Sequence, residues 1–368
     1  MAGQDISSLS VEQKIGQLFF VGVPGADFDR ATVDLLGEIQ PGGICLFARN
    51  IIGLRQTRDL LDSMFGLLPI PPLLSLDQEG GRVDRLRRVL SPMPAASRLR
   101  DADDAQRLGE LIGETISLLG FNMDFAPVVD VIEGARREFS NGLESRGFGR
   151  TKFDVVEMAN AFILGLERYN VLGCLKHFPG LAAAQVDSHE ELPVVPIETD
   201  ELYSVDLYPY KQLLTQNSKL SVMVAHAAYP GTRLQEMDDS GNLLPSSLNG
   251  RIVKTLLRDE LQFSGVAITD DMEMGAIVRN YGIGDASKLA VQAGVDMIAI
   301  CASEDSIRAA YGALVDAVYS GELTIERIDA SIERIMALKD HFTDRPEYDE
   351  ARLGELAEEI ATLCEELS

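Results

Sequence analysis

The amino-acid sequence predicts an α/β protein built as a single (β/α)8 barrel, and three features support this prediction. Short apolar segments alternate with amphipathic segments of helical period, which is typical of repeated βα units and a parallel sheet. The apolar segments show no polar alternation, as expected for strands that helices cover. The length of 368 residues fits one TIM-type barrel, and neither a second core-forming region nor a Pro/Ser-rich linker interrupts the chain.

The apolar segments predict eight strands, which are Ile15–Val23, Gly43–Phe47, Pro72–Asp77, Phe121–Asp130, Val171–His177, Leu220–His226, Gly265–Asp270 and Val295–Cys301. The helical periods predict helices at Ala31–Ile39, Ile52–Leu67, Ala105–Leu118, Asp154–Arg168, Leu202–Gln216, Arg251–Glu260, Gly284–Ala293 and Ser306–Ser320. Ser10-Val11-Glu12-Gln13 has the pattern of a capping box, so a short leading helix is expected to begin there.

The end of the chain is expected to form an appendage. We assign residues 1–343 to the barrel and residues 344–368 to an acidic, amphipathic C-terminal helix. Apolar residues at helical spacing predict a face that docks on the barrel, and these residues are Leu353, Leu356, Ile360 and Leu363. The glutamates of the segment are expected on the opposite, solvated face.

Composition and charge limit the partners of this chain. With 46% hydrophobic and 25% charged residues, it resembles a soluble globular protein with a large core. A formal net charge of −25 repels nucleic acid and anionic membranes, so we expect neither as a partner. No apolar run of about 18 residues appears, and the N-terminus has no basic stretch before an apolar one. We therefore expect a cytoplasmic protein, and we expect it to be a monomer.

The cysteines do not form a metal or redox motif. Cys45, Cys174 and Cys301 lie far apart inside apolar segments, Cys364 lies near the end of the chain, and no C-x-x-C pair occurs. We interpret them as small buried hydrophobic residues. No Gly-rich phosphate loop opens a helix either. We therefore expect no metal ion and no cofactor.

Polar residues gather at the carboxyl ends of the predicted strands, where the active sites of such barrels lie. These residues are Asp77 after the third strand, Asp130 after the fourth, Lys176 and His177 at the end of the fifth, His226 after the sixth and Asp270 after the seventh. A cap or a salt bridge explains any one of them equally well. Because buried charges need partners, so many at one rim predict a polar pocket there.

The loop after the fifth strand carries a second group of polar residues. Asp187-Ser188-His189 follows Lys176-His177-Phe178-Pro179-Gly180, so two of the four histidines lie within thirteen positions. A carboxylate near an imidazole can accept its N–H and raise its basicity, which makes a proton-transfer pair. Together with Asp270, this pair has the equipment for glycoside chemistry, in which one group attacks the anomeric carbon and another protonates the leaving oxygen.

Four motifs resemble, in order, those of the bacterial β-N-acetylglucosaminidases (β-hexosaminidases) of glycoside hydrolase family 3. They are Pro41 to Asn50, which looks like the family's second strand; Asp77 to Arg85, similar to D-Q-E-G-G-R-V-x-R; Lys176 to His189, similar to K-H-F-P-G and D-S-H; and Ile268 to Met274, similar to the nucleophile segment. With Arg146-Gly147-Phe148-Gly149 and Ser331 to Ile335, the resemblance extends from about residue 10 to about residue 340.

The resemblance implies a retaining hydrolase that removes terminal β-linked N-acetylglucosamine from a small carbohydrate. By the same resemblance, Asp270 is expected to attack the anomeric carbon, and His189, oriented by Asp187, is expected to act first as acid and then as base. Histidine suits this role because its unperturbed pKa of about 6.5 lies near neutral pH. The positions matching the family's sugar-holding residues are Asp77, Arg85, Arg146, Lys176 and His177. For a cytoplasmic bacterial member, the resemblance further suggests cell-wall (muropeptide) fragments as substrates.

Three features of the sequence allow more than one interpretation. Strand alternation does not decide between Asp270 and Asp271, and we choose Asp270 by its motif position. Leu181-Ala182 replaces the usual His-Gly after K-H-F-P-G, and losing glycine would stiffen the loop if it needs a positive φ. Residues 133–144 are also unlike the family pattern before Arg146. One alternative is a phosphorylase with the same dyad, because a neutral histidine repels phosphate less than a carboxylate does. A sugar-binding protein without catalysis is suggested by the altered loop, and a barrel lyase with Lys176 as Schiff base is the last alternative.

Overall fold

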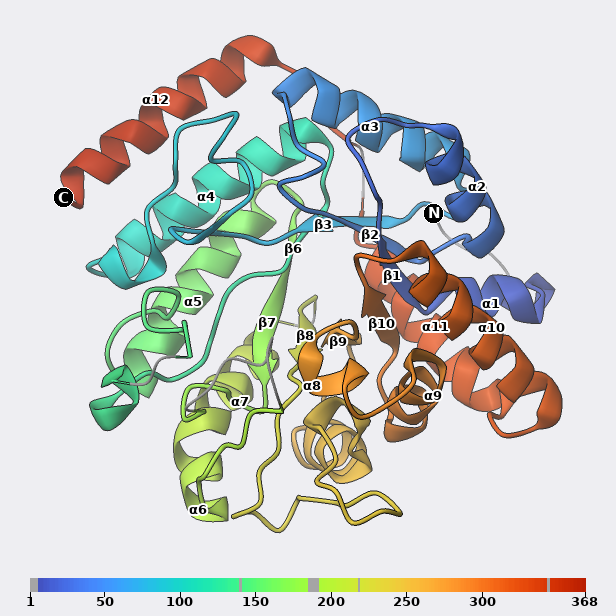
Figure 1. Ribbon diagram of the computed structural model, residues 1–368. Helices are drawn as coiled ribbons and strands as arrows, with labels where there is room; N and C mark the ends of the chain where they lie inside the picture. The colour runs from blue at the N-terminus through green and yellow to red at the C-terminus, as the bar shows by residue number, and fades with distance from the viewer. Residues whose placement is uncertain (1–5, 139–140, 185–191, 218, 343–344) are drawn as a thin grey trace.

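The computed structural model describes residues 6–138, 141–184, 192–217, 219–342 and 345–368, and its centre is a closed parallel barrel (Figure 1). Within these ranges eight strands close the sheet in chain order, and the last strand pairs with the first. They are β1 (Phe19–Gly22), β2 (Gly43–Leu46), β3 (Leu73–Leu76), β6 (Met123–Asp124), β7 (Leu172–Phe178), β8 (Ser221–Val224), β9 (Ala267–Asp271) and β10 (Met297–Ile300). The predicted (β/α)8 fold class is confirmed.

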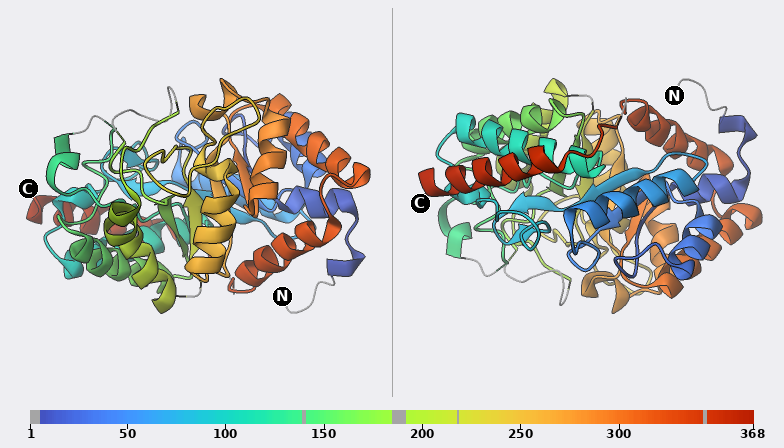
Figure 2. Two further views of the ribbon diagram at one scale, coloured as in Figure 1. Left: turned by 90° about the horizontal axis from the view of Figure 1, so that it is seen from below. Right: turned by 90° about the horizontal axis from the view of Figure 1, so that it is seen from above.

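Helices cover the outside of the barrel (Figures 1 and 2). The longer ones are α2 (Arg30–Ile39), α3 (Leu54–Leu67), α4 (Ala102–Leu119), α5 (Lys152–Glu167), α7 (Leu207–Gln216), α9 (Ile283–Ala293), α10 (Glu304–Ser320), α11 (Ile325–Lys339) and α12 (Glu350–Glu366). Shorter ones are α1 (Val11–Gln17), α6 (Thr199–Glu201), α8 (Gly275–Val278) and the 3-10 turns Ile6–Ser8, Ala96–Arg98, Gly134–Glu138 and Ser246–Leu248. Leu202–Asp206 and Arg251–Glu260 are π-helical. Among the described helices, none is long and apolar enough to cross a membrane.

The start of the barrel differs from the prediction. The expected strand Ile15–Val23 is helical in its first part, because α1 reaches Gln17 and β1 begins only at Phe19. The capping box that predicted this helix is present: Gln13 N donates to Ser10 Oγ at 3.2 Å, and Ser10 N donates to Gln13 Oε1 at 3.1 Å. The last residues of α1 are buried and the buried strand β1 follows almost at once, so the apolar pattern alone does not show where the helix ends and the strand begins.

The fourth expected strand, Phe121–Asp130, is also shorter than predicted, because the regular strand β6 contains only Met123–Asp124. Pro127, which has no N–H to donate to a sheet, follows soon after. An isolated bridge between Val128 and Lys176 keeps the chain beside β7 up to the rim. The strand therefore ends early, but the backbone still carries Asp130 to the position that the sequence predicted.

Helix α12 lies along α4 on the outside of the barrel (Figure 2). The Arg352 guanidinium forms two contacts of 2.6 and 2.8 Å with the Glu114 carboxylate of α4. The apolar face expected from the sequence is completely buried, and its residues are Leu353, Leu356, Ile360 and Leu363. Burial of this face, rather than the exposed charges, holds the helix in place.

Candidate active site

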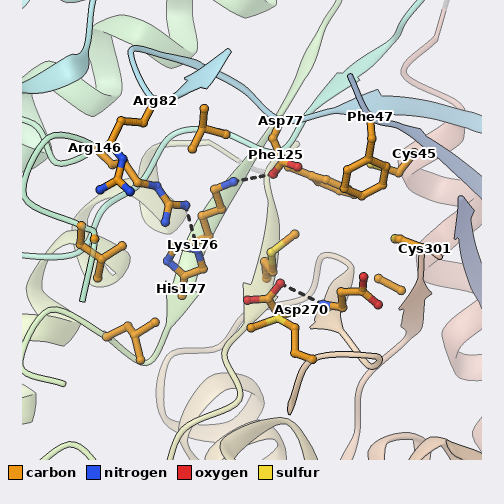
Figure 3. A pocket seen from close by; sticks show the side chains of 18 of the residues that line it. Cys45, Phe47, Asp77, Arg82, Phe125, Arg146, Lys176, His177, Asp270 and Cys301 are labelled. Atoms are coloured by element: carbon orange, nitrogen blue, oxygen red, sulfur yellow. Dashed lines mark hydrogen bonds and ion pairs between the residues drawn. The ribbon is translucent and has the colours of Figure 1, made fainter. Parts of the chain in front are cut away.

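A cavity of about 550 Å³ lies at the carboxyl ends of the barrel strands (Figure 3). Its lining includes six residues that the sequence placed at this site, namely Asp77, Arg85, Arg146, Lys176, His177 and Asp270. They are spread along the chain from residue 77 to residue 270, and closure of the barrel brings them around one space. Figure 3 shows Arg146, Lys176 and His177 on one side of the cavity and Cys45 and Cys301 on the other.

A small hairpin that the sequence did not predict positions Asp77 and Arg85. It is formed by β4 (Gln78–Gly80) and β5 (Val83–Asp84) directly after β3. Gly80 and Gly81 turn the chain with φ values of 86° and 59°, which residues with a side chain rarely adopt. The turn brings Arg85 Nη2 to 2.9 Å from Asp77 Oδ2. The ion pair with Asp77 thereby fixes the Arg85 guanidinium at the cavity wall.

Lys176 is the centre of a buried ionic network below the cavity wall. Its Nζ lies 2.7 Å from Asp77 Oδ1 and 2.6 Å from Glu79 Oε1. Arg146 in turn holds Glu79 through two contacts of 2.8 and 2.9 Å. Glu79 was not among the residues predicted for the site. Its position in a D-Q-E segment at the end of a strand could have identified it as a site residue. The pairing of Glu79 with Arg146, however, depends on the tertiary fold.

The network keeps its members ionised although they are buried. Burial opposes the charged form of each group, but the Lys176 and Arg85 cations outweigh it and hold the pKa of Asp77 far below its usual range. The cations Lys176 and Arg146 likewise lower the pKa of Glu79 to about 2. The two carboxylates raise the pKa of Lys176 above its ordinary value. A lysine held as ammonium is a poor nucleophile, which argues against the Schiff-base lyase.

His177 joins the network to the chain beyond β7. Its Nδ1 lies 2.8 Å from Asp130 Oδ2, and its Nε2 lies 3.3 Å from Arg146 Nη2. Because a guanidinium can only donate, Nε2 must accept and Nδ1 carries the hydrogen that Asp130 receives. The other oxygen of Asp130 accepts from Leu181 N at 2.6 Å. One buried carboxylate therefore orients the imidazole and anchors the start of the following loop.

Asp270 faces this charged wall from the end of β9. The register there shifts by one residue, since Met297 of β10 pairs with Ile268 but Ala299 pairs with Asp271. Thr269 Oγ1 accepts the Ala299 N–H at 3.0 Å in place of a backbone carbonyl. Such a bulge re-aims side chains and breaks strict alternation. Asp270 and Asp271 therefore both line the cavity, which explains why alternation did not separate them.

The two adjacent aspartates have different environments. Burial, with the neighbouring Glu273 and Asp270 charges, raises the pKa of Asp271 to about 7. Asp271 Oδ1 also accepts from Glu273 N at 3.1 Å, so this oxygen supports the local turn. Asp270 Oδ1 accepts from Asp271 N at 2.9 Å. A nucleophilic carboxylate must be ionised, so the raised pKa of Asp271 argues against Asp271 as the nucleophile.

His226, predicted at the same rim, lies behind the cavity rather than in it. It is almost fully buried, and burial lowers its pKa. Its Nε2 lies 3.1 Å from the Asp271 carbonyl, which can only accept, so Nε2 carries the hydrogen. Nδ1 is then free to accept from Ser247 Oγ at 2.7 Å. His226 therefore braces the end of β9 below the two aspartates.

Asp187 and His189, predicted as the proton-transfer pair, lie outside the described residues. The chain that leads to them is well held, because Asn141 Nδ2 donates to Ala182 O at 3.1 Å and to Ala184 O at 2.8 Å. The residues with a side chain and positive φ in the described ranges are Gln40, Asn170 and Gln262. Ala182 is not one of them, so replacing glycine there strains no backbone.

Comparison with known proteins agrees with this geometry. Residues 10–338 match the model of the glycosyl hydrolase family 3 N-terminal domain. The chain belongs to glycosyl hydrolase family 3. It is therefore a glycoside hydrolase, and the resemblance seen in the sequence motifs is confirmed.

Relatives in glycosyl hydrolase family 3 are similar over most of the chain. A β-hexosaminidase of Glaesserella parasuis is 30% identical over 295 residues, covering 79% of this chain and 82% of the relative. The β-hexosaminidase LpqI of Mycobacterium tuberculosis is 33% identical over 341 residues, covering 90% and 83%. The solved structure of a β-N-acetylglucosaminidase from a Paenibacillus species superposes with a TM-score of 0.87 at 31% identity, covering 97% of this chain and 69% of that one.

Proposed function

We propose that this family 3 hydrolase is a retaining exo-β-N-acetylglucosaminidase that removes terminal β-linked N-acetylglucosamine. The names of the similar proteins support the choice of sugar. The structural observation that carries the proposal is the bulge in β9, which turns Asp270 into the cavity opposite Lys176 and Arg146. A carboxylate that faces a wall of fixed donors and acceptors is suited to attack on a sugar that is held still.

In this mechanism the sugar binds against the charged wall. Asp77 offers carboxylate oxygens to hydroxyl groups, and cationic side chains donate to others. The residues proposed to hold the sugar are Asp77, Arg85, Arg146, Lys176 and His177. Because these groups are already held by ion pairs and hydrogen bonds, little reorganisation is needed when the sugar arrives, and the reacting carbon is kept in line with Asp270.

Two steps then follow. Asp270 forms a bond to the anomeric carbon while His189, oriented by Asp187, gives a proton to the leaving oxygen. His189 then takes a proton from water, which attacks the same carbon and releases Asp270. The Asn141 contacts to Ala182 and Ala184 hold the chain just before this pair, which supports the assignment of the loop to the site.

We further propose cell-wall muropeptide fragments as substrates, in a cytoplasmic setting. Arg82 lines the cavity and is exposed. In the described part of the chain it has no ion-pair or hydrogen-bond partner, although the protein as a whole is strongly acidic. An unpaired cation at the cavity edge suits a leaving group that carries a carboxylate, as such fragments do.

The first test is release of nitrophenol from 4-nitrophenyl N-acetyl-β-D-glucosaminide beside the corresponding β-glucoside, with and without phosphate. Selective turnover of the acetamido sugar, unchanged by phosphate, is the expected result. Acceleration by phosphate with release of sugar 1-phosphate would identify a phosphorylase instead. Ligand binding without turnover of either substrate would leave the non-catalytic sugar-binding function.

A further inference from the structure

Two thiols meet on the wall of the cavity that faces the charged network. Cys45 belongs to β2, and Cys301 directly follows β10. The strand between them, β1, presents Gly22 opposite Cys45. A Cβ at Gly22 would lie only 2.0 Å from the Cys301 carbonyl oxygen, so the missing side chain lets the end of β10 come close. The two cysteine side chains interact across this glycine, and both reach the cavity.

The thiol pair is reachable from the cavity although little of it is exposed. Cys45 and Cys301 are 1% and 5% exposed, yet both line the cavity. They are the cysteines found there among the described residues, since Cys174 is buried within β7 and Cys364 lies in α12. The sequence interpretation as isolated small hydrophobic residues therefore missed their contact.

The surroundings of the pair favour a soft cation. Met223 and Met274 add thioether sulfur to the same cavity. Carboxyl groups line it as well, and their negative charge attracts cations; they are Asp77, Asp270, Asp271 and Glu273. The neighbouring Cys45 side chain and burial raise the pKa of Cys301 well above its usual value, so a metal that binds Cys301 must displace its proton.

We propose that Cys45 and Cys301 form a binding site for a soft, low-coordinate metal cation of the Cu⁺, Ag⁺ and Hg²⁺ class. Each S–H bond loses its proton to solvent, and two sulfur–metal bonds form without any change of oxidation state. Thiolates select such soft cations. Zinc requires about four ligands, and in the described ranges no group of three or more His, Cys, Asp and Glu side chains is placed to hold a metal.

A metal at this site would share the cavity with Asp270 and with any bound substrate. Its occupancy should therefore inhibit turnover in competition with substrate. The binding itself does not depend on which sugar the enzyme accepts or on which carboxylate attacks it. Metal binding measured without substrate thus tests this proposal separately from the proposed function.

The test is titration of the full-length protein with Ag⁺ in chloride-free buffer, followed by calorimetry and by ultraviolet absorption of the silver–thiolate bond. The wild type is expected to bind one equivalent tightly. Cys45→Ser and Cys301→Ser should each bind about 100-fold more weakly, because one thiol remains and chelation is lost. Cys174→Ser and Cys364→Ser are the matched controls and should bind like the wild type. Equal tight binding by Cys45→Ser or Cys301→Ser would overturn the proposal.

A second measurement needs no variant, which guards against a substitution that disturbs folding. The wild-type protein is alkylated with N-ethylmaleimide for long enough to label Cys45 and Cys301 without metal, and the labelling is repeated with one equivalent of Ag⁺. Each cysteine is followed by peptide mass spectrometry. Silver should protect Cys45 and Cys301 and leave the labelling of Cys364 unchanged. Protection of Cys364 alone, or of no cysteine, would show that the pair does not bind the metal.

Discussion

Two buried ionic clusters occupy opposite ends of the barrel, and they differ in what surrounds them. The upper cluster joins Lys176 to Asp77 and Glu79 beyond the carboxyl ends of the strands, and it borders the cavity. The lower cluster surrounds Asp296, the residue just before β10 at the opposite end of the strands. Both are buried and both are paired, so burial and pairing alone do not distinguish them.

The lower cluster uses its carboxylate to join structural elements. Asp296 Oδ1 accepts from Ser331 Oγ at 2.8 Å and from Arg334 Nη1 at 3.1 Å, which attaches α11. Asp296 Oδ2 accepts from Ala267 N at 3.0 Å and pairs with Arg258. The carboxylate thus lies inside a closed set of donors, and none of these residues lines the cavity. In the upper cluster, by contrast, charged side chains are left facing an open space.

The difference shows that a buried charge indicates a functional site only when it lies at the right end of the barrel and borders a cavity. In barrels of this kind, chemistry lies at the carboxyl ends of the strands, and the opposite end contributes stability. Substitutions at the two ends should therefore separate activity from stability, and the following predictions test this separation.

The largest effect is expected from Asp270→Ala at the upper end. Loss of the nucleophile should lower kcat by about 10⁴-fold or more while the free energy of unfolding changes little. Steady-state hydrolysis of the nitrophenyl substrate and a thermal melt measure the two quantities. Activity close to that of the wild type would exclude Asp270 as the nucleophile, and Asp271→Ala tested beside it would show whether the neighbour acts instead.

Lys176→Met should reduce both activity and the free energy of unfolding, because it leaves Asp77 and Glu79 buried without their shared cation. We expect the free energy of unfolding to fall by about 3 kcal/mol and kcat/KM to fall by about 100-fold through misplacement of the sugar. Chemical denaturation and steady-state kinetics measure these changes. If Lys176→Met kept full kcat/KM, the upper cluster would be structural like the lower one.

Asp296→Asn at the lower end should lower stability and leave activity unchanged, which is the opposite of the result expected for Asp270→Ala. Three arginines would lose their carboxylate, and we expect the free energy of unfolding to fall by about 3 kcal/mol. The three are Arg258, Arg327 and Arg334. Turnover per folded molecule should stay at the wild-type value, because no cavity residue is touched. A folded variant with a strongly reduced kcat would mean that the two ends of the barrel are coupled.

The smallest effect is expected at Lys339, a buried lysine at the lower end of the barrel. In the part of the chain that the structure describes, no carboxylate pairs with it. Its Nζ donates to Gln17 Oε1 at 2.8 Å, and burial lowers its pKa to about 7. The unfolded chain therefore binds the proton more tightly, so this residue's contribution to stability is present above its ordinary pKa and is lost as the pH falls toward about 7.

Lys339→Met should remove this dependence. The stability difference between variant and wild type is expected to change by roughly 1.4 kcal/mol for each pH unit between about pH 7 and about pH 10. Denaturation curves across this range, with Lys219→Met as the exposed control, measure the slope. Parallel stability curves for Lys339→Met and the wild type would mean that Lys339 is not buried as a neutral amine.

The sequence alone determined the order of the strands and most of the helices, because burial imposes a local period on the residues that face the core. It also located Asp77, Lys176, His177 and Asp270 at one rim, since residues that end parallel strands share one end of the barrel. Even the buried face of α12 followed from the spacing of Leu353 and its partners. The roles of these site residues, and of Asp187 and His189, stay predictions.

Tertiary structure decided what depends on contacts between distant segments. The bulge that aims Asp270, the pairing of Glu79 with Arg146 and the meeting of Cys45 with Cys301 leave no local pattern. The hairpin that brings Arg85 to Asp77 was equally hidden, although its glycines were visible. Each of these features arises only when the closing sheet sets how closely neighbouring strands approach. A sequence period reports whether a side chain is buried, and it carries no information about which distant side chain is buried beside it.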